Sequence, residues 1–140
     1  MSYASIVPLI GGETIAMENI FGEKPKYFLT FEGFQANEEH LLNYYDHSVP
    51  YLNLSEGHSF TEKVDVINTV CPCAGLSSLS PSAASNNPMN EWMYKSAEYV
   101  LGEVKPKVFW GENAPRLASK MGEPVAVSYT HLTLPTILLV

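Results

Sequence analysis

The stretch Tyr3-Ala4-Ser5-Ile6-Val7-Pro8-Leu9-Ile10-Gly11-Gly12 is a mostly apolar run that ends in two glycines. Such a run, stopped by glycine, is typical of a buried strand that enters a tight turn. The next residues, 13–21, place apolar side chains at helical spacing, and Gly22 ends that pattern. The N-terminus therefore predicts the strand, glycine turn and helix with which an α/β domain begins.

The same alternation continues along the chain. Further apolar runs bounded by turn residues predict four more strands, with helical patterns between them. Strands that alternate with helices form a mostly parallel, doubly wound sheet, whose ligands bind at the carboxyl ends of the strands. The expected strands are residues 26–31, 49–54, 64–70 and 107–110, and the expected helices are 38–45 with Asn37 as its cap, 89–104, and a short one over 115–121.

The chain of 140 residues is long enough for one domain. Residues 127–140 have no charged side chain, match neither a helix nor a strand period, and look like translated sequencing-adapter sequence. We therefore assign residues 1–126 to the domain and treat 127–140 as a non-native tail. An apolar edge strand is the alternative interpretation of the tail.

Composition restricts the class of protein. A net charge of −7 gives no general attraction to the phosphate backbone of a nucleic acid. The two cysteines, Cys71 and Cys73, are too close in sequence for an unstrained disulfide and suit a reducing compartment. No apolar run reaches the roughly 18 residues of a membrane span, and no basic signal region opens the chain. We expect a soluble, cytoplasmic monomer that does not act at a membrane.

Two strands of the expected sheet end in residues that carry chemistry. The strand 64–70 runs into Cys71-Pro72-Cys73, and the strand 107–110 runs into Gly111-Glu112-Asn113. A thiol exposed at a strand end can react as its thiolate, and a partly buried carboxyl group can act as an acid. A thiol and a carboxyl group on neighbouring strand ends suggest covalent catalysis with proton transfer.

Five motifs of the chain, in this order, resemble those of the cytosine-C5 DNA methyltransferases. The opening Phe-x-Gly-x-Gly-Gly turn of that family corresponds to residues 7–12, its acidic residue at the end of the second strand to Glu32, and the Asp-Ile pair that ends its third strand to Asn53-Leu54. Its Pro-Cys-Gln-x-x-Ser motif reads Pro72-Cys73-Ala74-Gly75-Leu76-Ser77 here, and its Glu-Asn-Val motif reads Glu112-Asn113-Ala114. Order and spacing agree over about residues 5–120.

The resemblance implies a Rossmann-like domain of the S-adenosylmethionine-dependent type, incomplete at its C-terminus, that methylates cytosine in DNA. Cys73 would attack C6 of a flipped-out cytosine, and Glu112, followed by Asn113, would assist at N3. No metal is implied. A bacterial cytoplasm, or that of a phage host, is the implied setting. The implied cofactor contacts are Ile10, Gly11, Gly12, Glu32, Asn53, Leu54 and Pro72, with Glu32 accepting the ribose hydroxyls.

The chain also departs from the family pattern. Leu9 replaces the first glycine of the opening turn, Ala74 the glutamine after the nucleophile, and Asn53 the aspartate after the third strand. The family's Gln-x-Arg-x-Arg motif and recognition domain do not follow. We therefore expect the N-terminal catalytic part of a divergent methyltransferase, inactive by itself.

Three alternatives remain open. A methyltransferase-fold module that binds cofactor or nucleic acid without turnover would tolerate the substitutions at Leu9 and Asn53. A thiol hydrolase would need a histidine base near Cys73. A zinc site of the two cysteines with His47 and His58 is disfavoured, because zinc sites prefer two to four residues between paired cysteines. The candidate histidine bases are His40, His47 and His58.

Overall fold

The computed structural model describes residues 1–57 and 62–126, so the tail that the sequence analysis set aside, 127–140, lies outside the described residues. All five predicted strands are present, and the last runs two residues further than expected, to Glu112. The main elements are β1 (Tyr3–Ile6), α1 (Gly12–Phe21), β2 (Phe28–Thr30), α2 (Gln35–Tyr44), β3 (Tyr51–Asn53), β4 (Val66–Val70), α3 (Glu91–Tyr99) and β5 (Val108–Glu112).

The five strands form one parallel sheet in the order β3-β2-β1-β4-β5. The chain starts at the centre, builds outward through β2 to β3, and then returns across β1 to place β4 and β5 on the other side. The point where the strand order reverses therefore lies between β1 and β4. In open parallel sheets, the carboxyl ends of the strands at such a point are where ligands bind.

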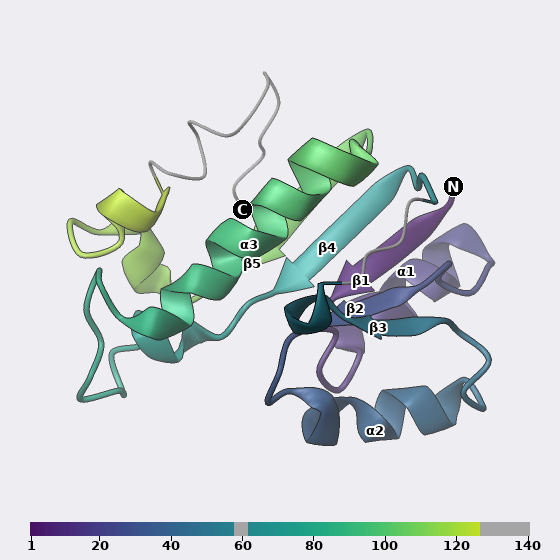
Figure 1. Ribbon diagram of the computed structural model, residues 1–140, viewed down its shortest axis with the longest axis horizontal. Helices are drawn as coiled ribbons and strands as arrows, with labels where there is room; N and C mark the ends of the chain where they lie inside the picture. The colour runs from purple at the N-terminus through teal and green to yellow at the C-terminus, as the bar shows by residue number, and fades with distance from the viewer. Residues whose placement is uncertain (58–61, 127–140) are drawn as a thin grey trace.

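Helices cover both faces of the sheet (Figure 1). On one face, Ile6, Leu29 and Ile67 pack against Tyr99 and Val100, at the end of α3 and just beyond it. On the other face, Tyr3 packs with Met17 of α1, and Phe28 packs with Leu41 of α2. The predicted parallel α/β sheet is confirmed, and its strand order is compatible with a Rossmann-like fold.

Three predicted helices differ from those observed. The short helix expected over 115–121 is a 3₁₀ turn, η5 (Pro115–Ala118). Helix α2 begins at Gln35, with Phe34 as its N-cap and no capping side chain, so the predicted Asn37 cap is wrong. Gly33, at φ 95°, makes the turn into this helix, and its N–H donates to the Gln35 Oε1. The single helix expected over 89–104 is divided into a 3₁₀ turn η3 (Pro88–Asn90), α3 and a π-helical turn η4 (Val100–Val104).

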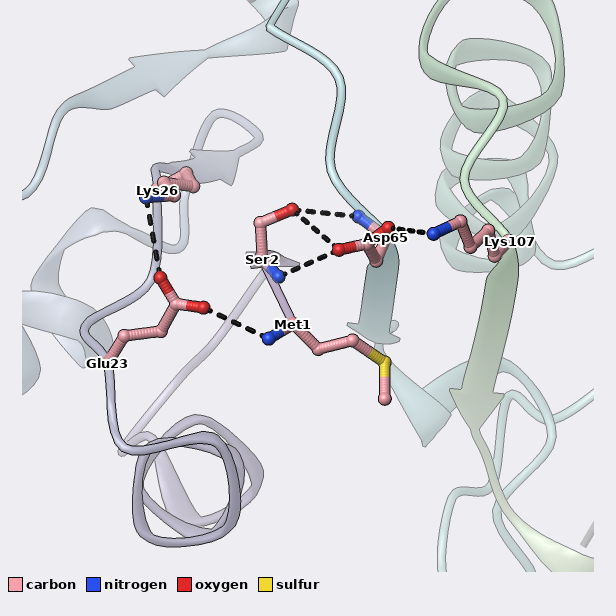
Figure 2. Close-up of polar contacts among 6 residues, drawn as sticks. All are labelled: Met1, Ser2, Glu23, Lys26, Asp65 and Lys107. Carbon is pink, nitrogen blue, oxygen red and sulfur yellow. Dashed lines mark hydrogen bonds and ion pairs between the residues drawn. The ribbon is translucent and has the colours of Figure 1, made fainter.

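At the amino ends of the strands, Asp65 joins β1, β4 and β5 (Figure 2). The Ser2 backbone N–H and hydroxyl donate to Asp65 Oδ2 at 3.0 and 3.1 Å, and the Lys107 ammonium lies 2.7 Å from Oδ1. A second, exposed pair in the same view links the N-terminal ammonium to Glu23 at 3.2 Å. This polar cluster fastens the end of the sheet opposite to the candidate site.

Asp65 gives a prediction about acid stability. Its pKa is lowered to about 2, first by the hydrogen bond from Lys107 and then by those from Ser2. A carboxyl whose pKa is lowered by folding stabilises the protein above its unfolded pKa, and this contribution is lost as pH falls toward the folded pKa. Between about pH 4 and pH 2, melting temperature should therefore fall more steeply for the wild type than for Asp65→Asn. Parallel curves would contradict the prediction, and Asp46→Asn, an exposed aspartate outside the cluster, is the control.

Candidate active site

The register of β4 and β5 brings the two predicted catalytic motifs to adjacent strand ends. Val70, the last residue of β4, lies opposite Glu112, the last residue of β5. Cys73 follows Val70 by three residues, and the side chains of Cys73 and Glu112 are both exposed. The sequence analysis expected Glu112 to be partly buried, and that expectation is wrong, because β5 lies at the edge of the described sheet.

The two cysteines have opposite surroundings. Cys73 is the first residue of a 3₁₀ turn, η2 (Cys73–Gly75). The Cys73 carbonyl oxygen accepts the backbone N–H groups of Leu76 and Ser77 at 2.9 and 2.7 Å. Cys71 is buried, with its Sγ 3.1 Å from Thr69 Oγ1, and burial raises the pKa of its thiol. Because the thiolate is the reactive form, Cys73 is the cysteine available for chemistry and Cys71 is a core residue.

Asn113 fastens the end of β5 to a helix. Its Nδ2 donates to the Met93 Sδ of α3 at 3.0 Å, and its Oδ1 accepts the Ala114 N–H at 2.7 Å. The amide is therefore engaged within the protein, which favours a role in orienting the Glu112 turn. Pro72, which precedes Cys73, is half-buried at the start of η2.

The turn between β1 and α1 is left-handed at several residues. Gly11 has φ 85°, and a Cβ built there would lie 2.3 Å from the Leu41 Cδ1. Gly12 has open space around its Cα, and Ile10 is 76% exposed. Leu9 has φ 49°, so the residue at the family's first glycine position keeps a backbone conformation that favours glycine.

The ends of β2 and β3 are tied together through Ser55. The Ser55 hydroxyl accepts the Glu32 backbone N–H at 2.9 Å. The Glu32 side chain is exposed, and its carboxylate faces solvent. Asn53 Oδ1 accepts the Ser55 N–H at 2.9 Å and so caps the turn η1 (Leu54–Glu56). The structure thus gives Asn53 a capping role, while Glu32 remains available to a ligand.

A pocket of about 300 Å³ lies beside these strand ends, between them and α3. Phe31 stacks on Trp92 at 4.5 Å between ring centroids, which orders one wall. A lining that combines aromatic and aliphatic side chains with three charged ones suits a flat ring that carries polar substituents. The lining residues are Phe31, Leu54, Gly57, Lys95, Glu98, Tyr99 and Glu103.

A buried carboxyl group that is not among the predicted site residues, Glu38, lies near these strand ends. Glu38 is fully buried in α2 and accepts the Tyr51 hydroxyl at Oε2, 2.5 Å away. Burial raises the pKa of Glu38, and hydrogen bonds from Tyr51, Thr30 and the Leu9 backbone oppose that rise. The spacing of Glu38 with Leu41, Leu42 and Tyr45 could have placed it on the buried face of the helix.

The predicted site residues thus collect at the carboxyl ends of β1, β2, β3, β4 and β5, either as the last residue of a strand or in the segment that follows it. Among residues 1–57 and 62–126, no group of three or more His, Cys, Asp or Glu side chains is arranged to hold a metal ion. His58, part of the zinc and thiol-hydrolase alternatives, is outside the described residues. No helix in the described part of the chain has the length and apolar character needed to cross a membrane.

No protein-family model matches this chain, and no curated protein matches it significantly.

Proposed function

We propose that residues 1–126 form the cofactor-binding, nucleophile-bearing part of an S-adenosylmethionine-dependent DNA cytosine-C5 methyltransferase. The observation that carries this proposal is the exposed Cys73 beside the end of β4, with Glu112 on the neighbouring strand end. Support also comes from the opening turn and Glu32, which follow β1 and β2 as the resemblance requires.

The carboxyl edge fits the proposed cofactor. The exposed Glu32 carboxylate can accept both ribose hydroxyls, and the open space at Gly12 lets backbone approach the cofactor closely. The pocket of about 300 Å³ presents Phe31 and Leu54, against which the adenine ring could pack. The bound cofactor would supply the methyl group.

The protein's own residues would activate the cytosine. The Cys73 thiolate adds to C6, and the electron pair of the C5–C6 double bond becomes available at C5. Glu112 must be protonated for this step, because only the carboxylic acid can donate a hydrogen bond or proton at N3 and so stabilise the charge that develops on the ring. After C5 is methylated, its proton passes to solvent water, the C5–C6 double bond reforms and the C6–S bond breaks, which restores the thiolate; any proton placed on N3 returns to Glu112. A base inside a duplex cannot reach Cys73, so the cytosine must be flipped out.

The charge of the chain limits what it does alone. With a net charge of −7, residues 1–126 offer no general attraction to phosphate, so DNA affinity must come from basic residues elsewhere. We expect this chain alone to bind DNA weakly and to turn over little.

A non-catalytic module that binds the cofactor is the second candidate. The observation that favours it is Asn53, whose side chain is occupied by the η1 cap instead of facing a ligand. Such a module would bind cofactor without forming a covalent adduct through Cys73, and the two candidates are therefore separable by experiment.

Cofactor binding is the direct test of the proposal. In calorimetric titrations of the chain with S-adenosylmethionine, Glu32→Gln should weaken binding by about 10- to 100-fold, because it removes the charge from two hydrogen bonds. Glu39→Gln, an exposed carboxylate on α2, should bind like the wild type. Absence of binding by the wild type would refute the cofactor assignment, and equal affinities would refute the role of Glu32.

A further inference from the structure

A buried amide lies under the loop that follows the Cys73 turn. Asn90, the last residue of η3, is 1% exposed. Its Nδ2 donates to two successive carbonyl oxygens of the loop, those of Ala84 at 3.0 Å and Ser85 at 3.2 Å. Both N–H donors of the amide therefore bind the second half of the loop formed by residues 76–87.

The same side chain contacts the Cys73 turn. A Cβ built on Gly75, the last residue of η2, would lie 2.2 Å from the Asn90 Oδ1, so the amide occupies the space that a side chain at position 75 would need. The Gly75 carbonyl also accepts the Ala84 N–H at 3.0 Å. Asn90 thus lies where the η2 turn, at Gly75, meets the later part of the loop, at Ala84.

Core packing by itself would not favour an asparagine at position 90. The Asn90 Oδ1 is buried and has no hydrogen-bond partner among the described residues. A buried polar atom without a partner destabilises the folded protein, and an apolar residue of similar size would avoid that loss. The two bonds from Nδ2 fix the loop in one place, and an apolar residue would not supply them.

We propose that Asn90 is a positioning residue that holds the loop of residues 76–87 against the η2 turn and so fixes how the Cys73 thiol is presented. The proposal rests on the proposed role of Cys73 as the nucleophile. Asn90 acts through the carbonyl oxygens of Ala84 and Ser85, to which it donates, and through its close approach to Gly75.

The test measures Cys73 reactivity in the full chain, with Cys71→Ser as background so that one thiol is followed. Asn90→Asp keeps the shape of the side chain, removes both donors and places charge against two carbonyls. It should change the iodoacetamide alkylation rate of Cys73 by about threefold or more, shift the pH dependence of that rate, and speed elastase cleavage within 76–87. Gly75→Ala places a methyl group against the Asn90 amide and displaces it, so this variant should change the same three quantities.

Asn86→Asp is the matched control, because it introduces the same charge at an exposed position of the same loop. It should leave alkylation and cleavage unchanged. If folded Asn90→Asp and Gly75→Ala both keep the wild-type rate and pH dependence, the proposal is overturned; if Asn90→Asp does not fold, Gly75→Ala alone decides. Calorimetry with S-adenosylmethionine separates the two proposals, since failure of the wild type to bind cofactor leaves the effect on Cys73 intact.

Discussion

Gly11→Ala should lower the free energy of unfolding by about 2–5 kcal/mol, a large loss for one added methyl group. Two costs combine at this position. The backbone has φ 85°, where an L-residue with a side chain costs about 1–2 kcal/mol. The new Cβ would also lie 2.3 Å from the Cδ1 of Leu41, which is only 1% exposed, and overpacking a core costs about 1–3 kcal/mol.

Gly22→Ala separates these two costs. Gly22 ends α1 with φ 71°, and a Cβ there would meet no atom within 4 Å. It should therefore show only the backbone cost of about 1–2 kcal/mol in urea denaturation. If both variants lose the same free energy of unfolding, Leu41 moves aside freely. The close approach of Gly11 to α2 would then contribute nothing to the loss.

The strands could be predicted because their signals are local. Each is a short apolar run stopped by a turn residue, as at Val70 before Cys71-Pro72, and no distant residue is needed to recognise it. Sheet order has no such signal, because the pairing of β1 with both β2 and β4 depends on contacts between segments far apart in sequence. The start of α2 was mistaken because Asn37 looks like a cap, whereas the turn at Gly33 begins the helix earlier.

The candidate site was predictable to the same extent. Every predicted site residue lies at or just after the carboxyl end of a strand, so a parallel sheet brings them to one end of the sheet, as the structure has it. What those side chains contact was not predictable. The space at Gly75 is filled by Asn90, fifteen positions away, and the amide of Asn113 is taken up by Met93. Such partners are set by how loops return to the sheet, which a pattern of residue types does not encode.

The largest functional effect is expected from Cys73→Ser. With DNA that contains 5-fluorocytosine and with S-adenosylmethionine, the complete gene product should form a covalent adduct, because fluorine at C5 cannot leave as the ring proton does. A serine hydroxyl is far weaker as a nucleophile than a thiolate at neutral pH, so Cys73→Ser should form no adduct above background. Gel electrophoresis under denaturing conditions measures the trapped fraction.

Cys71→Ser provides the comparison that makes this result specific. The substitution is chemically identical and lies two residues away, but Cys71 is 2% exposed, with Thr69 and Ser96 beside its sulfur. It should lower stability modestly and retain the adduct. An adduct in Cys73→Ser equal to that of the wild type would refute the mechanism. A wild type that binds S-adenosylmethionine but traps no DNA would favour the non-catalytic module, because an exposed thiol at the end of β4 would then serve no covalent step.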